Sequence, residues 1–162
     1  MKHICKSLAE IRSILPSGKS FTLVSGCFDL LHVGHLHLLE YASRLESMLV
    51  VAILSDRYIQ GYKNSSRPII PEKQRAMLVT SLRCVDVVYI SDVSPNDEST
   101  LTALRPTSIV FDDSIRNSEK MKLRLSQIQK WLPCTKVHFL PRYMDESVST
   151  TQIIDRIRGI AK

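Results

Sequence analysis

Two histidines, His32 and His35, stand three residues apart shortly after an apolar run near the start of the sequence. The run at residues 21–25 is typical of a buried strand, and Gly26 permits the chain to turn after it. From Gly34 onward the apolar residues keep largely to helical spacing, which predicts that both imidazoles lie around the first turn of a helix. A helix start offers unpaired N–H groups and a partial positive charge. Two imidazoles added to it favour a site for a polyphosphate.

The same pair of histidines has an alternative interpretation, which is a metal site. Zinc sites usually need a third and a fourth ligand, and no HExxH or CxxC spacing in the sequence supplies them. We therefore predict no protein-bound metal at this pair. The other histidines, His3, His37 and His138, show no partner pattern and are interpreted as packing or surface residues.

A second helix start is predicted at residues 149–152. Ser149 is followed three residues later by Gln152, ahead of several isoleucines, which is the pattern of a capping box. The hydroxyls and free amides of Ser149, Thr150 and Thr151 could hold the β and γ phosphates of a nucleotide. The alternative is a cap that only starts the last helix, and the histidine motif favours the phosphate site over it.

Residues 26–35 read GCFDLLHVGH and match GxFDxxHxGH, the signature of the cytidylyltransferase-like nucleotidyltransferases. The segment VSTTQII, at residues 148–154, is similar to the ISTT or CSTT segment of the same enzymes. From about Ser7 to the last helix, the chain resembles glycerol 3-phosphate cytidylyltransferases and the adenylyltransferase domain that makes ADP-heptose. The resemblance implies transfer of a nucleoside monophosphate from CTP or ATP to a small phosphorylated acceptor, such as glycerol phosphate or a sugar or heptose phosphate, with release of pyrophosphate. Mg²⁺ is expected with the triphosphate, held largely by phosphate oxygens and water.

The resemblance also implies roles for individual residues. His32 and His35 would donate hydrogen bonds to the phosphates, with His35 at the α phosphate, and Lys63 would hold the phosphate of the acceptor. Asp29 would orient the turn or a magnesium-bound water, or would cap the helix. The other residues expected around the nucleotide are Gly26, Cys27, Phe28, Gly34, Arg83, Asp86, Asp112, Asp113, Arg142, Ser149, Thr150 and Thr151.

The resemblance points in two directions on the choice of nucleotide. Arg83, Arg142 and the two aspartates at 112–113 are similar to residues of the cytidylyltransferases. By contrast, GCFD, the leading helix, the spacing of residues 63–75 and STTQII are similar to the heptose adenylyltransferases. These features place CTP slightly ahead of ATP.

Two residues depart from the family pattern, because Phe111 and Ser147 stand where the family has glycines. Phe111 is expected to crowd a place where the backbone normally approaches the nucleotide. A protein that keeps the fold and binds a nucleotide as a sensor, without transferring it, is therefore the alternative function.

Strand and helix patterns alternate along the sequence, which predicts a Rossmann-like α/β fold. We expect an open five-stranded parallel sheet with helices on both faces, in a single domain spanning residues 1–162, and a ligand at the carboxyl ends of the strands where the strand order reverses. The polar stretch at residues 55–70 is interpreted as a long functional loop. Strands are expected at residues 21–25, 48–54, 85–90, 108–111 and 136–140. Helices are expected at residues 7–15, 71–82, 99–104 and 119–131, and from residues 34 and 149 onward.

The composition agrees with a globular enzyme that binds anions. The 162 residues carry a formal net charge of +6 and 44% hydrophobic residues. The basic residues are spread along the chain without an RNA-binding signature, so small phosphates are favoured over nucleic acid and over an RNA-binding module. No apolar run is long enough for a membrane span, and the four cysteines lack paired spacing, so a cytoplasmic enzyme is expected. Similar enzymes are commonly dimers, and the sequence leaves the oligomeric state open.

Overall fold

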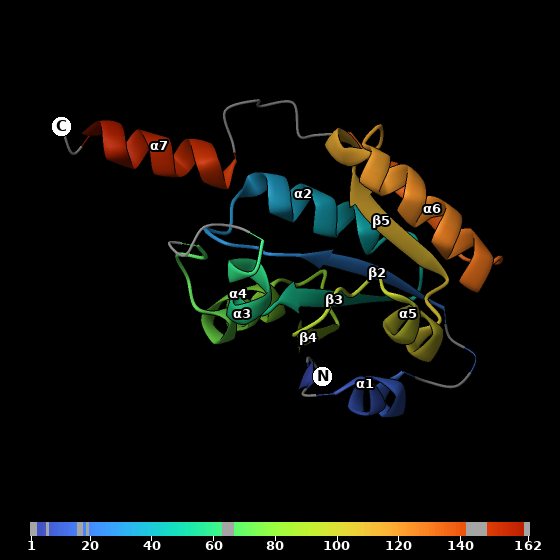
Figure 1. Ribbon diagram of the computed structural model, residues 1–162. Helices are drawn as coiled ribbons and strands as arrows, with labels where there is room; N and C mark the ends of the chain where they lie inside the picture. The colour runs from blue at the N-terminus through green and yellow to red at the C-terminus, as the bar shows by residue number, and fades with distance from the viewer. Residues whose placement is uncertain are drawn as a thin grey trace.

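The computed structural model describes residues 3–5, 7–15, 18, 20–62, 67–141 and 149–160. These residues form one parallel sheet with helices packed on it (Figure 1). The sheet has six strands in the order β1-β4-β3-β2-β5-β6. The strands are β1 (His3–Cys5), β2 (Phe21–Gly26), β3 (Met48–Leu54), β4 (Val87–Ser91), β5 (Ser108–Asp112) and β6 (Lys136–Leu140). The predicted Rossmann-like α/β fold is therefore confirmed.

The sheet has one strand more than the five that the sequence predicts. β1 has only three residues, HIC, and pairs with β4 at the edge of the sheet, His3 opposite Val87 and Cys5 opposite Tyr89. Three residues are too few to show a hydrophobic period, so pairing with a neighbour, not a local pattern, defines this strand.

The helices begin where the sequence places polar caps or proline. They are α1 (Leu8–Ile14), α2 (Val33–Ala42), α3 (Asp56–Gln60), α4 (Glu72–Ser81), α5 (Glu98–Leu104), α6 (Glu119–Trp131) and α7 (Thr150–Ile160), with a short 3₁₀ helix, η1 (Asp113–Ile115). The Ser7 side chain accepts a hydrogen bond from the Glu10 N–H and caps α1, as Ser118 does for α6 through the Met121 N–H. The stretch at residues 55–70 is not a continuous loop, because Ser55 caps the short helix α3.

Two apolar clusters hold the helices on opposite faces of the sheet. On one face, residues of α1, α5 and α6 such as Ile11, Leu101 and Met121 pack on the strands. On the other face, α2 and α4 pack through residues such as Leu39 and Val79. Alternate residues of each strand serve the two clusters, as expected for a parallel sheet that is covered on both sides.

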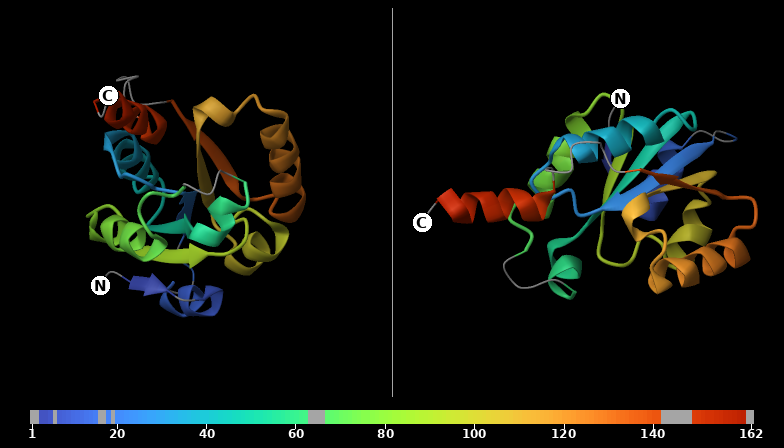
Figure 2. Two further views of the ribbon diagram at one scale, coloured as in Figure 1. Left: turned by 60° about the vertical axis from the view of Figure 1, so that its left-hand side comes forward. Right: turned by 90° about the horizontal axis from the view of Figure 1, so that it is seen from above.

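The chain order reverses at β2, which has β3 on one side and β5 on the other. In open parallel sheets, ligands bind outside the carboxyl ends of the strands at such a point. α7 starts near this edge and extends away from the rest of the domain (Figure 1 and Figure 2). Among the described residues, no helix has the length and apolar character needed to cross a membrane.

Candidate active site

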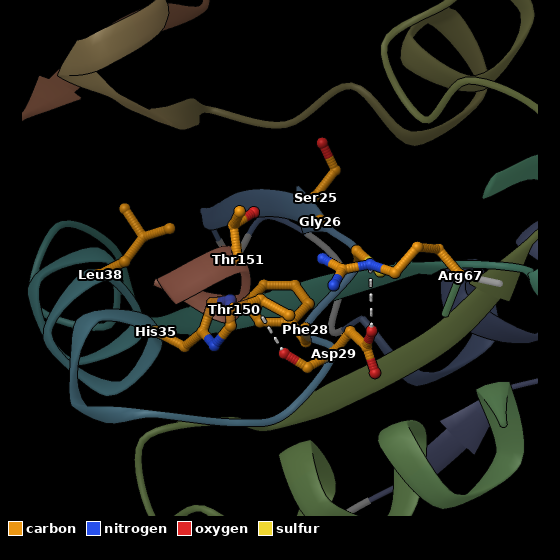
Figure 3. A pocket seen from close by; sticks show the side chains of 10 residues that line it. Ser25, Gly26, Phe28, Asp29, His35, Leu38, Arg67, Thr150 and Thr151 are labelled. Carbon is orange, nitrogen blue, oxygen red and sulfur yellow. Dashed lines mark hydrogen bonds and ion pairs between the residues drawn. The ribbon is translucent and has the colours of Figure 1, made fainter. Parts of the chain in front are cut away.

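A cavity of about 200 Å³ opens at the carboxyl end of β2 (Figure 3). Its walls come from the end of β2 and the turn after it, from α2, from the segment before α4, and from the start of α7. The lining residues are Ser25, Gly26, Cys27, Phe28, Asp29, His35, Leu38, Arg67, Thr150 and Thr151. The structure thus brings together residues more than one hundred positions apart in the sequence, including both predicted phosphate motifs.

The turn after β2 is tightly folded. Phe28 and Leu30 have positive φ angles of 50° and 48°, which are uncommon for residues other than glycine. A Cβ on Gly26 would lie 2.9 Å from Cε2 of the Phe28 ring, which is too close. Gly26 therefore lets the buried Phe28 ring fold back over the strand end, where its centroid lies 5.3 Å from that of His35.

The geometry of the two histidines fixes the tautomer of one of them. Their rings stack with centroids 3.8 Å apart, and the backbone N–H of His32 donates to Nδ1 of His35 at 3.4 Å. Because Nδ1 of His35 accepts this bond, the proton of the neutral ring is on Nε2. His35 lines the cavity, so its Nε2–H is available as a donor to a ligand. His32, which was expected to contact the phosphates as well, does not line the cavity and stacks on the His35 ring.

Both imidazoles are kept neutral at pH 7. Burial, and then the neighbouring His32, lower the pKa of His35 to about 4, against a smaller opposing effect of Asp29. Burial also lowers the pKa of His32. The cavity therefore offers a neutral hydrogen-bond donor at His35.

Asp29 is a buried carboxylate that holds two segments of backbone together. Its carboxylate is 1% exposed and accepts hydrogen bonds from the backbone N–H groups of Ile69 and Ile70, both at 2.9 Å. Nε of Arg67 lies 3.8 Å from the same carboxylate. Asp29 thus ties the segment before α4 to the turn after β2. It does not cap α2, because His32 is the N-cap residue, and both of its oxygens are already engaged.

The start of α7 is joined to the same turn. The Ser149 hydroxyl accepts a hydrogen bond from the Gln152 N–H at 3.2 Å, so the predicted helix cap is confirmed. The Thr150 hydroxyl donates to the backbone carbonyl of Asp29 at 2.8 Å. Thr150 and Thr151 line the cavity close to His35, while Ser149 stays outside the lining.

Two arginines at this edge of the sheet were not singled out by the sequence analysis. Arg67 lines the cavity beside Asp29. Arg75 is fully buried and donates to the backbone carbonyls of Cys27, Ile70 and Leu54. It also pairs with Asp56, whose Oδ1 lies 2.6 Å from its guanidinium.

A signal for Arg75 is present in the sequence. It belongs to a predicted helix in which Ala76 and Val79 face the core, so its charge has to be paired. Arg67 gives no comparable signal, because it is a polar residue in a polar stretch.

Two predicted site residues lie at the amino ends of the strands, on the side of the sheet away from the cavity. Asp86 precedes β4, and its Oδ2 accepts a hydrogen bond from the Leu49 N–H at the start of β3, at 2.8 Å. Arg83 is exposed in the same connection. Neither residue lines the cavity. The described geometry therefore does not support the expected contribution of this pair to the nucleotide site.

Asp112, the last residue of β5, and Asp113 lie at the carboxyl ends of the strands but do not line the cavity. Asp112 accepts a hydrogen bond from the Ser114 N–H at 2.8 Å and caps η1, and Asp113 pairs with Arg116 at 2.6 Å. Phe111 is 6% exposed and its ring lies 5.9 Å from that of Phe139 in the core. The expected crowding of the site by Phe111 is therefore wrong, because the side chain alternates into the core.

The other predicted residues lie in α2 or outside the described part of the chain. Gly34 lies in the first turn of α2. Lys63, Arg142 and Ser147 fall outside the described residues. Within the described ranges, no group of three or more His, Cys, Asp or Glu side chains is arranged to hold a metal ion.

Two solved structures illustrate the similarity in fold. The lipopolysaccharide core biosynthesis protein from Thermoplasma volcanium GSS1 is 28% identical, with a TM-score of 0.65 over 78% of this chain and 99% of that protein. Pantoate-beta-alanine ligase from Francisella tularensis, solved with a β,γ-ATP ligand and β-alanine, has a TM-score of 0.65 over 98% of this chain and 77% of the ligase. Since the ligase is only 14% identical, its similarity concerns the fold alone.

Two similar sequences are described as the bifunctional protein HldE. The bifunctional protein HldE of Campylobacter fetus subsp. fetus is 40% identical over 153 residues, which is 94% of this chain and 31% of the relative. HldE of Helicobacter pylori strain ATCC 700392 / 26695 is 34% identical over 152 residues, which is 94% of this chain and 30% of the relative. The chain spans about a fifth to a third of the length of the curated relatives that it matches.

The family model described as cytidylyltransferase-like matches residues 23–156, which include both motifs that meet in the cavity. The chain therefore belongs to the cytidylyltransferase-like family.

Proposed function

We propose that this chain transfers a nucleoside monophosphate from ATP to a small phosphorylated acceptor, preferably a sugar phosphate, and releases pyrophosphate. The observation that carries the proposal is the position of His35. Its Nε2–H is directed to a cavity that also contains the first residues of α7, so two kinds of hydrogen-bond donor meet at one place. Triphosphates bind well where imidazole and backbone donors converge.

The reaction is a direct displacement at the α phosphorus. An oxygen of the acceptor's phosphate forms a bond to this phosphorus, the bond to the bridging oxygen of the β phosphate breaks, and pyrophosphate leaves on the opposite side. No proton transfer from the enzyme is required, because both the attacking and the leaving oxygens are those of phosphates. Neutral His35 would donate a hydrogen bond to the α phosphate as negative charge builds and would keep its proton.

Positive charge is needed beside the acceptor, because two anionic substrates repel one another. Arg67 supplies a guanidinium in the cavity, held partly by its ion pair with Asp29. Lys63 is proposed for the acceptor's phosphate, as the resemblance implies.

Mg²⁺ is proposed to accompany the triphosphate and to neutralise part of its charge. The described residues fit an ion that is held by phosphate oxygens and water, because both carboxylate oxygens of Asp29 already accept backbone hydrogen bonds. The protein's contribution is then to orient the phosphates through His35 and the start of α7.

ATP is preferred to CTP, which reverses the order taken from the sequence. Of the residues that favoured cytidine, Arg142 lies outside the described residues, and the others do not line the cavity. Arg83 lies at the amino ends of the strands, and the two aspartates at 112–113 organise η1. The relatives reported above are HldE proteins, and the sequence resembles heptose adenylyltransferases.

A coupled assay for pyrophosphate tests the proposal. The chain is mixed with Mg²⁺, ATP or CTP, and one acceptor from a panel of glycerol 3-phosphate, hexose 1-phosphates and heptose 1-phosphate. We expect pyrophosphate release only when a nucleotide and an acceptor are both present, fastest with ATP and a sugar phosphate. A nucleotide-dependent rise in melting temperature without pyrophosphate release, across the panel, would instead support the sensor.

A further inference from the structure

A buried hydrogen bond connects the cavity to a loop that the proposed mechanism does not use. Ser25, near the end of β2, lines the cavity. Asn96, in the loop between β4 and α5, is 8% exposed, and its Nδ2 donates to Oγ of Ser25 at 3.0 Å. The backbone N–H of Asn96 donates to the Ser94 hydroxyl at 3.3 Å, which holds the loop around this side chain.

The direction of this bond decides what Ser25 can offer to a ligand. A serine hydroxyl has one hydrogen to donate and two lone pairs that accept. Because the Asn96 amide occupies the acceptor side of Ser25, the hydroxyl hydrogen is free to point to the cavity. Ser25 is therefore set as a hydrogen-bond donor, and its partner has to present an oxygen that accepts.

Within the described part of the chain, the carbonyl half of the Asn96 amide is an unsatisfied acceptor next to this hydrogen bond. Its Oδ1 is buried and has no hydrogen-bond partner within the described residues. Buried polar atoms in native proteins are nearly always satisfied, so an unpartnered one calls for a ligand or water hydroxyl in the occupied site. A hydroxyl both donates and accepts, so a ligand rich in hydroxyls matches this pair of groups.

Ser25 and His35 reach the cavity from opposite faces of the sheet. Two residues before Ser25, Leu23 belongs to the cluster under α1, α5 and α6, whereas His35 comes from α2 on the other face. In Figure 3, His35 and Leu38 lie to the left, Ser25 at the top and Arg67 to the right. Ser25 therefore contacts a part of the ligand other than the phosphates held by His35.

We infer that Ser25, positioned by Asn96, donates a hydrogen bond to a hydroxyl oxygen of the acceptor, which makes the acceptor a polyhydroxylated phosphate ester. The inference rests on the proposed function, in which Arg67 offsets the acceptor's charge. Arg67 and Asn96 both follow strands on the β3 and β4 side of β2, so one acceptor spans them, with its phosphate near Arg67 and a hydroxyl at Ser25.

Substitutions at the two positions test the inference. Titration calorimetry with a hexose 1-phosphate, with inorganic phosphate and with ATP is combined with KM values from the pyrophosphate assay. For Ser25→Ala we expect about tenfold weaker binding of the sugar phosphate, the effect of one lost hydrogen bond, while ATP and inorganic phosphate change less than about twofold. Ser25→Thr, which keeps the hydroxyl, should bind like the wild type.

Asn96→Asp is the sharpest variant because it keeps the shape of the side chain. A carboxylate at this place accepts the Ser25 hydrogen and turns it away from the cavity, so binding of the sugar phosphate should fall as in Ser25→Ala. The double variant should be no worse than Ser25→Ala. Ser99→Ala removes an exposed hydroxyl from the start of α5 and is the matched control, with binding unchanged.

The outcomes separate this inference from the proposed function. Unchanged sugar phosphate affinity in Ser25→Ala or Asn96→Asp, or an equal loss for ATP, would overturn the role of Ser25. If the wild type binds the sugar phosphate but releases no pyrophosphate with any acceptor, the proposed transfer is wrong. The role of Ser25 is then tested by the calorimetric affinity for the sugar phosphate alone. A wild type that binds inorganic phosphate as tightly as every sugar phosphate contradicts the hydroxyl contact.

Discussion

Two aspartates, Asp29 and Asp86, perform similar hydrogen-bond chemistry at opposite edges of the sheet. Asp29 accepts from the backbone N–H groups of Ile69 and Ile70 at the carboxyl ends of the strands. Asp86 accepts from the Leu49 N–H at the amino ends. Each carboxylate ties one segment of backbone to another, and both belong to segments that resemble family motifs.

The difference lies in what surrounds each aspartate. Around Asp29, three connections meet, from α2, from the segment before α4 and from the start of α7, and they leave a cavity with His35 at its wall. Around Asp86, the polar groups of neighbouring strands satisfy one another through bonds such as Asp86 N–H to Leu49 carbonyl. Whether an aspartate in a motif lies beside a ligand site therefore depends on which ends of the strands it is close to.

The largest expected effect comes from removing the buried positive charge of Arg75, which supports the carboxyl ends of the strands. Arg75→Ala leaves Asp56 without its partner and three backbone carbonyls without a donor. We expect the free energy of unfolding, measured by urea denaturation, to fall by about 3–5 kcal/mol. Lys73→Ala, on the exposed side of the same helix, should change it by less than about 0.5 kcal/mol. A loss below about 1 kcal/mol at Arg75 would show that the edge does not depend on this charge.

The second effect is on the rate rather than the stability. His35→Ala removes the donor to the α phosphate, and kcat for pyrophosphate release should fall by about 10²–10³-fold, as for the loss of one donor to a developing charge. His37→Ala, on the same helix but outside the cavity lining, is the control and should keep its rate. Near-normal turnover of the His35 variant would refute the assignment.

A matched pair of substitutions tests the two aspartates directly. Asparagine has one acceptor oxygen where Asp29 serves two N–H groups, so Asp29→Asn should cost about 1–3 kcal/mol of stability and raise KM. The single bond at Asp86 survives in Asp86→Asn, which should cost less than about 1 kcal/mol and leave KM unchanged. Denaturation measures the stability of both variants, and steady-state kinetics measures their KM. Equal effects of the two substitutions on KM would contradict the proposed difference between Asp29 and Asp86.

The smallest effect concerns the attachment of α7. Thr150→Val removes the hydroxyl that donates to the Asp29 carbonyl but keeps a similar shape. We expect about 0.5–1.5 kcal/mol lower stability and a several-fold higher KM for ATP. Thr150→Ser keeps the hydroxyl and should restore both values, whereas a silent Thr150→Val would mean that α7 does not form the wall of the nucleotide site.

The sequence predicts the fold well because continuous apolar runs and capping residues act locally. The observed bounds of β3 and β6 are those expected, and α6 begins and ends at the expected residues. β1 and α3 escape prediction because three-residue and five-residue elements carry too little pattern.

The site is only partly predictable because its contacts join distant segments. The motif at residues 26–35 and the start of α7 indicate their own roles, and the structure shows that they meet. Ser25, Arg67 and Arg75 could not be assigned, since their partners, such as Asn96 for Ser25, are fixed only by the packing of separate loops.

Nitrogen NMR of the His35 ring tests the central claim most directly. The account predicts a neutral ring with its proton on Nε2 from pH 8 down to about 5, which becomes protonated as the pH falls through about 4 because burial disfavours the charged form. Addition of ATP and Mg²⁺ at pH 7 should shift the Nε2 resonance of this ring and leave that of His37 in place. A ring already protonated at pH 7, or a resonance that saturating ATP leaves unmoved, would contradict the account.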